Sequence, residues 1–287
     1  METNTSSLNK NKAIYDAKYD HVNVDSIVQK VRNFRAFLDD AVQTDTSWHG
    51  MYQGDFAARI VNKSVLELGC GDGLNALVMG ALGADVVAID ISKESENIIR
   101  KAASKLAVEN VKGGGGDFLD LAFQARSFDF IIGKAFLHHL THDQEAEYLK
   151  KVAVLLKTDG AARFFEPATN SLVLDKVRWM VPVPGRPSML SRTAFAEWKA
   201  RDPHPQRDNS SKHYSQVGKI FFDAVDIVYI GSIERLCRVL PRGDFNRRFR
   251  RWAHKVEKRM PMRLRHIFAR SQLVTYRNPR VPVVELA

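Results

Sequence analysis

The sequence predicts an α/β protein with a mostly parallel, doubly wound sheet. Two observations support this fold class. Short apolar runs typical of buried strands alternate with segments of helical periodicity, and a glycine-rich turn directly follows the first of these runs. With 45% hydrophobic residues, the 287-residue chain can fill the core of one large domain that carries insertions or a small cap. We therefore expect helices on both faces of one sheet, with a ligand at the carboxyl ends of its strands.

The predicted elements follow from these patterns in chain order. A helical pattern covers about 13–41, after a polar start of about a dozen residues that is predicted to be disordered. The expected strands are 64–68, 85–89, 128–133, 161–166, 224–230 and 272–277. The expected helices are about 73–82, 94–107 and 143–157. Four consecutive glycines at 113–116 stand in the place of a third strand, which should be weak or irregular.

The turn after the first strand has a glycine at every second position, in the run Glu67-Leu-Gly-Cys-Gly-Asp-Gly73. Glycine allows a tight turn and a close approach of the backbone to a ligand. A dinucleotide site would need a further glycine where Leu74 stands, and no Gly-Lys-Ser/Thr follows to make a phosphate-binding loop. Asp90 ends the next strand, about where a ribose would lie. These spacings predict a site for a nucleoside cofactor, and the carboxylate of Glu67 suits a ligand with a cationic amino-acid end.

The same run resembles the first motif of class I S-adenosylmethionine-dependent methyltransferases of the small-molecule type, and Asp90 matches the ribose-binding acid of that family. The resemblance extends over about 65–167. It implies a Rossmann-like, seven-stranded, doubly wound sheet whose last strand is antiparallel, here with a helical or irregular cap. The cofactor implied is S-adenosyl-L-methionine. The cofactor-binding residues implied are Tyr19, Glu67, Gly69, Gly71, Gly73, Asp90, Ile91, Asp117, Phe118 and Lys134, and Tyr15 is a further candidate beside Tyr19.

The candidate catalytic residues lie just after the fourth and fifth predicted strands. His138 and His139 follow the fourth strand, in a layout that resembles the family motif facing the transferred methyl group. Transfer to a hydroxyl needs in-line alignment and a base of near-neutral pKa, which histidine provides. We predict His138 as the first candidate base and His139 as the second, while the alternative is that the pair only caps the loop. Glu166 is predicted to orient a substrate hydroxyl or amine, or else to bond only to the following loop.

Other polar residues support weaker hypotheses. A metal site at His138, His139 and His142 is not predicted, because adjacent ring nitrogens diverge and no carboxylate partner is evident. Two cysteines provide neither a disulfide framework nor a metal cluster. Alternative substrate contacts in the cap region are His204, His213 and Tyr214.

The expected organisation places two insertions over the ligand face of the sheet. Both leave from carboxyl ends of strands, so they should form a cap above the active site. The predicted parts are an N-terminal helical lid (1–54), a cofactor-binding core (55–170), a cap insertion (171–212) and a C-terminal part of the core (213–287) with a basic helical insertion at about 233–270. The stretch from 168 to about 211 looks irregular.

Positive charge is concentrated in the second insertion. Between Arg235 and Arg270 the chain has 13 Lys or Arg and two acidic residues, a net +11 against +10 for the whole chain. Asp244 is a plausible N-cap of a helix whose apolar stripe is Phe245, Phe249, Trp252, Val256 and Met260. Three interpretations stay open: a lid helix whose stripe packs on the domain, a helix at 244–260 that rests on an anionic membrane, and a nucleic-acid contact.

The favoured function is methyl transfer to a small molecule, most simply to an oxygen of a secondary metabolite, sugar or lipid-linked intermediate; nitrogen and carbon acceptors stay open. An RNA methyltransferase is the alternative. Nucleic acid is disfavoured, because Gly133-Lys-Ala-Phe-Leu137 lacks the Asn/Asp-Pro-Pro-aromatic pattern of enzymes that methylate base nitrogens. A non-catalytic protein of this fold is a third possibility, but it should have lost the glycines or Asp90. Without a signal peptide or a membrane-spanning stretch, a cytoplasmic protein is expected, either free or peripheral at the inner face of a membrane.

Overall fold

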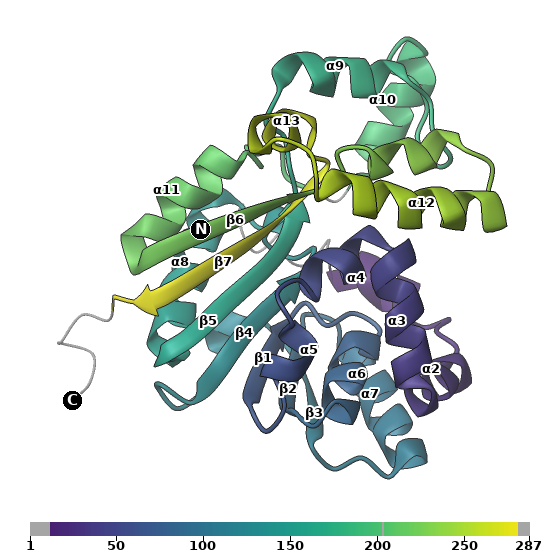
Figure 1. The fold of residues 1–287 in the computed structure, drawn as a ribbon. Coiled ribbons are helices and arrows are strands. Elements are labelled where there is room, and N and C mark those ends of the chain that lie inside the picture. Colours follow the sequence, from purple (N-terminus) through teal and green to yellow (C-terminus); the bar gives the residue numbers. More distant parts are fainter. Residues whose placement is uncertain (1–11, 203, 281–287) are drawn as a thin grey trace.

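The computed structural model describes residues 12–202 and 204–280. Most of the polar start of the chain, for which disorder is predicted, lies outside these ranges, as does the last part of the predicted C-terminal region. One seven-stranded sheet forms the centre of the molecule (Figure 1). Its strands are β1 (Ser64–Leu68), β2 (Asp85–Asp90), β3 (Val111–Gly115), β4 (Phe128–Lys134), β5 (Leu156–Pro167), β6 (Phe222–Ile230) and β7 (Ser271–Pro279).

The strand order is β3-β2-β1-β4-β5-β7-β6, and β7 runs antiparallel to both β5 and β6. The pairs β1–β2, β2–β3, β1–β4 and β4–β5 are parallel. The predicted seven-stranded sheet with an antiparallel last strand is confirmed. Because β1 and β4 are covered on both faces, they are nearly continuous apolar runs, which is why the sequence shows them so clearly.

Helices cover both faces and form two hydrophobic cores. One face packs against α2 (Val24–Arg32), α3 (Phe34–Thr44), α4 (Thr46–Met51), α5 (Phe56–Arg59), α6 (Leu74–Ala81) and α7 (Lys93–Leu106). The other face packs against α8 (His142–Leu155) and α11 (Ser211–Phe221). The helical pattern predicted over 13–41 is divided between helical residues 12–19, α2 and α3. The side chain of Asn23 accepts a hydrogen bond from Ser26 N and so begins α2 as a separate helix.

The glycine-rich third strand is regular, contrary to expectation. All five residues of β3 pair with β2. A Cβ atom at Gly113 would lie 3.2 Å from Glu96 Cα, and one at Gly115 would lie 3.1 Å from Lys93 Cα. The glycines therefore let the backbone of α7 approach the strand, and this packing compensates for the low strand propensity of glycine.

The two insertions lie together above the carboxyl ends of the parallel strands (Figure 1). The first contains α9 (Leu172–Met180) and α10 (Arg192–Ala200), so the stretch that looks irregular in the sequence is partly helical. The second contains the 3₁₀ helix η3 (Glu234–Val239), α12 (Asp244–Glu257) and α13 (Met262–Phe268). No helix among the described residues has both the length and the apolar character needed to cross a membrane.

Helix α12 packs through a different side from the one its apolar stripe suggests. Phe245 and Trp252 of the stripe are 63% and 52% exposed, whereas the buried residues are Ala253, His254 and Glu257. The Glu257 carboxylate accepts hydrogen bonds from the backbone of Gly231, Ile233 and Glu234, so polar contacts orient the helix. The stripe is thus only partly covered: Phe249, Val256 and Met260 are half-buried, and the lid interpretation stays a prediction. The expected N-cap is wrong, because Gly243 precedes the helix and Asp244 is its first residue.

We expect Gly73→Ala to destabilise the fold more than Gly54→Ala. Both glycines have positive φ, +70° and +65°, so both substitutions share a backbone cost of about 1–2 kcal/mol. Only at Gly73 would the new Cβ meet a neighbour, Ile99 Cγ1 at 2.2 Å, which adds about 1–3 kcal/mol of overpacking. Urea unfolding of both variants measures the difference, and equal losses would contradict the packing role of Gly73.

Candidate active site

The glycine turn between β1 and α6 is held to the end of β2 by hydrogen bonds. Gly69 N and Cys70 N donate to Ile89 O at 2.8 and 3.2 Å. Gly71 N donates to Asp90 Oδ2 at 2.9 Å, and Ser92 N donates to the other Asp90 oxygen at 3.0 Å. Both oxygens of Asp90 are therefore held in place by the backbone. This arrangement presents the turn and the carboxylate to the same cavity.

The cavity has a volume of about 450 Å³, a size typical of small-molecule sites. Eight of the ten predicted cofactor residues line it: Tyr19, Glu67, Gly69, Gly71, Asp90, Ile91, Phe118 and Lys134. Gly73 is not a lining residue and packs against Ile99 of α7. Asp117 is also absent from the lining, because its carboxylate accepts hydrogen bonds from Leu119 N and from the Tyr148 hydroxyl. The individual cofactor-binding roles stay predictions.

Glu67 has an unsatisfied carboxylate oxygen in this cavity. Its Oε1 accepts a hydrogen bond from Asn75 Nδ2 at 2.7 Å, whereas Oε2 is buried without a partner among the described residues. Burial raises the pKa of Glu67 to about 7, against the lowering effects of the Asn75 hydrogen bond and of the Lys134 charge. An orphaned buried acceptor of this kind fits a ligand that brings a cationic donor.

An N-terminal segment closes one side of the cavity. A Cβ atom at Gly71 would lie 3.1 Å from the Tyr19 hydroxyl, so the turn and the tyrosine approach closely. Tyr15 stacks on Tyr19, and its hydroxyl is 3.4 Å from His139 Nδ1. Burial raises the pKa of Tyr15 to about 12, which keeps its hydroxyl protonated as a donor. Both tyrosines named from the sequence thus lie at the cavity, as a segment that folds over the cofactor requires.

Glu166 connects the end of β5 to the turn after β4. Its Oε1 accepts hydrogen bonds from Phe136 N and Leu137 N at 2.9 and 2.7 Å. Its Oε2 accepts from His138 N at 3.2 Å and from His138 Nδ1 at 2.6 Å. Glu166 is fully buried, so as a carboxylate it needs these donors. A proton on Nδ1 leaves Nε2 of His138 with a free lone pair, which is the tautomer that a base requires.

Three histidines meet beside this turn. The ring centroids of His138 and His139 are 4.3 Å apart, and His204 of the first insertion lies 4.3 Å from His139 and 4.9 Å from His138. Each offers one nitrogen within 4.8 Å of the others, and His204 Nδ1 also bonds to Asp202. The sequence grouped His142 with the pair, but His142 stacks on His213 instead. Burial is the largest cause that lowers the pKa of His139, to about 2, so this ring stays neutral and is a weak base.

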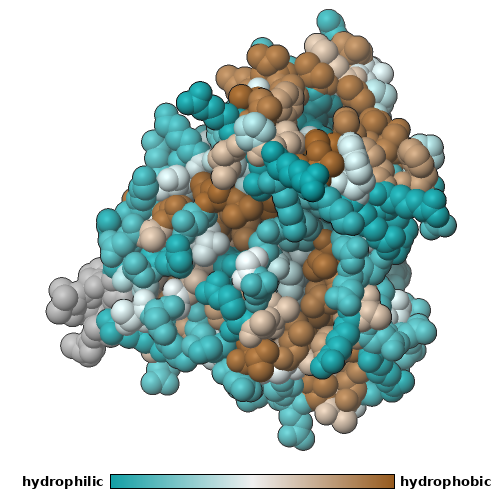
Figure 2. All heavy atoms as spheres, viewed as in Figure 1, coloured by the Kyte–Doolittle hydropathy of each residue, from teal (hydrophilic) through white to brown (hydrophobic). Residues whose placement is uncertain are grey.

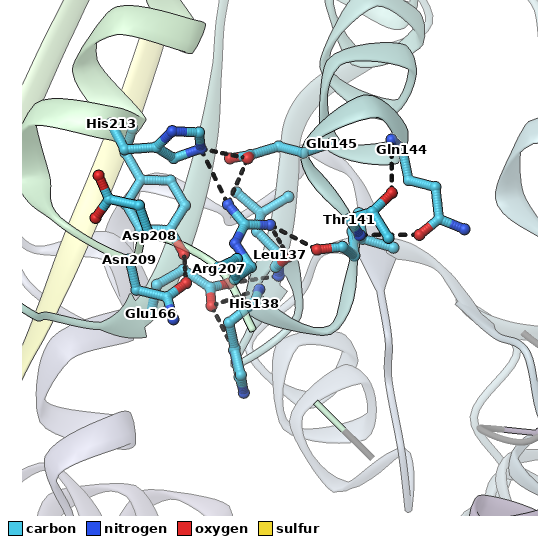
Figure 3. A network of polar contacts seen from close by, with 12 residues as sticks. Leu137, His138, Thr141, Gln144, Glu145, Glu166, Arg207, Asp208, Asn209 and His213 are labelled. Atoms are coloured by element: carbon cyan, nitrogen blue, oxygen red, sulfur yellow. Dashed lines mark hydrogen bonds and ion pairs between the residues drawn. The ribbon is translucent and has the colours of Figure 1, made fainter. Parts of the chain in front are cut away.

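A buried ion pair that was not predicted from the sequence fixes the cap to the turn after β4 (Figure 3). Arg207 donates to Leu137 O and Leu140 O, both at 2.8 Å, and pairs with Glu145 of α8. His213 Nε2 lies 2.7 Å from the same Glu145 oxygen, so this ring takes part in the pair, and its role as a substrate contact stays a prediction. In Figure 3 the His138 ring points away from this network. Arg207 is one of many arginines in the chain, and no local pattern distinguishes it.

Of the other two candidate substrate contacts, His204 lies near the site and Tyr214 lies in the core. Tyr214 is fully buried and its hydroxyl donates to Asn209 Oδ1 at 3.0 Å, so it packs in the core. His204 is the cap residue that reaches the histidine pair. The cap thus contributes one titratable side chain to the neighbourhood of His138.

Comparison with known proteins gives a family match over the core. Residues 65–160 match the family model of a methyltransferase domain. Cypemycin N-terminal methyltransferase of Streptomyces sp. is 36% identical over 102 residues, which are 35% of this chain and 40% of that protein. Ubiquinone biosynthesis O-methyltransferase of Acinetobacter baylyi is 30% identical over 111 residues, 38% of this chain and 46% of that protein. The matched segments span less than half the length of these relatives.

Solved structures share the fold at low sequence identity. Geranyl diphosphate C-methyltransferase from Streptomyces coelicolor, solved with S-adenosyl-L-homocysteine, superposes with a TM-score of 0.51 at 12% identity, over 79% of each chain. A phosphoethanolamine N-methyltransferase of Haemonchus contortus superposes with a TM-score of 0.54 at 11% identity, over 91% of this chain and 61% of that one. Residues 65–160 thus match a methyltransferase domain, and the chain shares the fold of these S-adenosylhomocysteine-bound proteins.

We expect Asp90→Ala to abolish measurable binding of S-adenosylmethionine, a loss of more than about 100-fold, because a charged acceptor at the end of β2 is removed. Isothermal titration calorimetry measures this affinity. Asp85→Ala, at the exposed start of the same strand, is the matched control and should bind normally. Unchanged affinity of the Asp90 variant would contradict the cofactor assignment of this cavity.

We also expect the stability of the folded protein to depend on pH through Glu67. Its pKa in the folded protein, about 7, lies above its ordinary value of 4.5. The folded protein therefore binds more protons than the unfolded chain between these values, so stability contributed by Glu67 is lost as pH rises through this range. In the absence of ligand, Glu67→Gln should match the wild type near pH 5 and exceed its stability near pH 8.

Thermal unfolding over this pH range measures the comparison. Affinity of the wild type for S-adenosylmethionine should rise above pH 7 as Glu67 ionises, and the glutamine variant should lack this rise. Parallel stability curves for the two proteins would show that Glu67 does not titrate as described.

Proposed function

We propose that the protein transfers a methyl group from S-adenosylmethionine to a small-molecule acceptor, most simply to an oxygen, with His138 as the base. The observation that carries the proposal is the 2.6 Å contact between His138 Nδ1 and the buried Glu166, beside a cavity shaped by the glycine turn. The family match supports the reaction class, while the roles of individual residues rest on the geometry of the site.

The residues of the cavity fit the cofactor. Glycine at position 69 lets the Phe136 ring pack against the turn, since a Cβ there would lie 2.5 Å from that ring. The orphaned Oε2 of Glu67 would hold the cationic amino group, and Asp90 would hold the ribose. When bound, S-adenosylmethionine supplies an electrophilic methyl group on a sulfonium.

His138 would take the proton of an acceptor hydroxyl as the oxygen–methyl bond forms and the methyl–sulfur bond breaks. Its Nδ1 is held by Glu166, which fixes the ring and stabilises the cation formed when Nε2 gains the proton. His139 is the weaker candidate because burial keeps it neutral. Glu166 acts here by positioning His138 and the turn, rather than by contacting a substrate hydroxyl as the sequence suggested.

The acceptor is proposed to lie between the cavity and the cap, where His204 approaches His138 and His139. The similar proteins have names that specify nitrogen, oxygen and carbon acceptors, so the fold does not select the acceptor atom. A secondary metabolite, a sugar or a lipid-linked intermediate fits a hydroxyl acceptor. For a lipid-linked acceptor we also propose peripheral contact of the segment 244–260 with an anionic membrane.

We expect His138→Gln to lower turnover by about 10²- to 10⁴-fold while leaving the affinity for S-adenosylmethionine unchanged, because general-base catalysis contributes factors of this size. The acceptor is first identified by incubating labelled S-adenosylmethionine with fractionated extracts, and turnover is then measured on the labelled product. His139→Gln is the matched control and should lose much less activity.

Three results would contradict the proposal. Wild-type turnover of the His138 variant would exclude that residue as the base. Label recovered only in RNA would favour the nucleic-acid alternative. Cofactor binding without label transfer to any fraction would favour a non-catalytic protein of this fold.

A further inference from the structure

The cap carries nearly all the exposed apolar side chains of the molecule. Among the described residues, the only exposed large hydrophobic side chains outside it are Val61, Leu119 and Ile220. In Figure 2, which has the view of Figure 1, brown side chains gather on the cap at the top of the molecule, with teal side chains beside them. An apolar surface of this extent marks an interaction site on a soluble domain.

Two cap helices contribute apolar side chains without burying any residue. In α9, Leu172 and Val173 are 82% and 71% exposed, and in α13 Met262 is 60% exposed. Hydrogen bonds join these segments: Asn170 Nδ2, just before α9, donates to His266 O of α13 at 3.1 Å. The apolar side chains thus belong to one contiguous part of the cap.

Helix α12 adds an exposed edge on which aromatic and cationic side chains alternate. Phe245, Arg248, Trp252 and Lys255 follow at spacings of three, four and three residues, which places them on one face of the helix, and Arg259 lies just beyond its last residue. All five are exposed. The buried residues Ala253 and Glu257 lie on a different side, so this edge stays free of the core.

Many cations of the second insertion have no internal partner. Arg247 and Arg251 pair with Asp40, and Arg250 pairs with Glu234. By contrast, six exposed cations form no ion pair with any described residue: Arg242, Arg248, Lys255, Lys258, Arg259 and Arg263. These unpaired charges accompany the apolar side chains of α12 and α13.

We propose that this surface docks the cap onto an anionic lipid bilayer. The docking surface comprises the exposed apolar side chains of α9, α12 and α13 and the six unpaired cations. Aliphatic and aromatic side chains enter the boundary between head groups and acyl chains, and the cations pair with anionic head groups. RNA would use the cations but would leave the leucine, valine and methionine side chains exposed. A second copy would bring six like charges against six.

The helices that carry this surface lie above the carboxyl ends of the strands (Figure 1). The cap also carries His204, whose ring lies beside that of His139. A docked protein would therefore hold its active site near the membrane surface. If the proposed function holds, this position favours an amphiphilic acceptor whose hydroxyl stands at the head-group level. The docking itself does not depend on the cofactor assignment.

The test is sedimentation of the full chain with vesicles of phosphatidylcholine containing phosphatidylglycerol, compared with pure phosphatidylcholine vesicles. We expect binding to the anionic vesicles that weakens as salt is raised. Arg248→Gln with Lys255→Gln should lower partitioning by about 30-fold, since each cation near the surface contributes about fivefold. Phe245→Ser with Trp252→Ser should also lose binding, because it removes the apolar contacts.

Matched controls test whether a loss of vesicle binding is specific to the docking surface. Lys101→Gln with Lys112→Gln removes two exposed cations outside the cap, and Ile220→Ser removes an exposed apolar side chain of α11. Both controls should sediment like the wild type. Arg247 is unsuitable as a target, because it pairs with Asp40. Calorimetry with S-adenosylmethionine should give the same affinity for all variants, which shows that they are folded.

Several outcomes would overturn the docking proposal. These are absence of binding to anionic vesicles at low salt, equal binding by the docking variants and the controls, and self-association lost in Phe245→Ser with Trp252→Ser. Preferential binding of RNA that depends on the same cations would also overturn it. If one of these results is found and the protein binds S-adenosylmethionine normally, only the docking proposal is contradicted. If the wild-type protein does not bind S-adenosylmethionine, the proposed function is contradicted.

Discussion

The hydrogen bonds of the buried Glu166 carboxylate are the interactions on which the candidate active site depends. It lies at the end of β5, opposite Gln272 of β7, and receives three backbone N–H groups and the His138 ring. A buried carboxylate without these donors would be very costly, so the turn after β4 can adopt few other conformations. The position of His138 relative to the cavity follows from this constraint.

The Arg207–Glu145 pair extends the same constraint into the cap. Arg207 binds the carbonyl groups of Leu137 and Leu140, which belong to the turn whose N–H groups Glu166 holds. The carboxylate of Glu166 therefore binds the backbone N–H groups of the turn, and the guanidinium of Arg207 binds its carbonyl groups. Because Arg207 and Glu145 are both buried, removing either would leave an uncompensated charge. The cap and the catalytic turn are in this way parts of one polar network.

Polar contacts also decide which surface the cap presents. Glu257 binds the backbone that follows β6, Arg250 pairs with Glu234, and His254 stacks on His49. These contacts orient α12 so that Phe245 and Trp252 of its apolar stripe stay exposed. The cap therefore has an exposed surface with apolar side chains and unpaired cations. The candidate active site is formed by other segments, in the core. The two proposed functions, methyl transfer and docking, thus rest on separate parts of the chain.

The sequence by itself determined the sheet, the glycine turn and eight of the residues that line the cavity, because these depend on local patterns: continuous apolar strands, closely spaced glycines and an acid at a strand end. The antiparallel last strand was implied by the resemblance to a known family. It also named His138 and Glu166. Only the tertiary structure decided that these two residues bond to each other, that His204 lies beside the histidine pair, and that Asp117 and Gly73 are not lining residues of the cavity. The orientation of α12 likewise depended on contacts with distant backbone. Such pairings join residues far apart in the chain, and local periodicity carries no information about them.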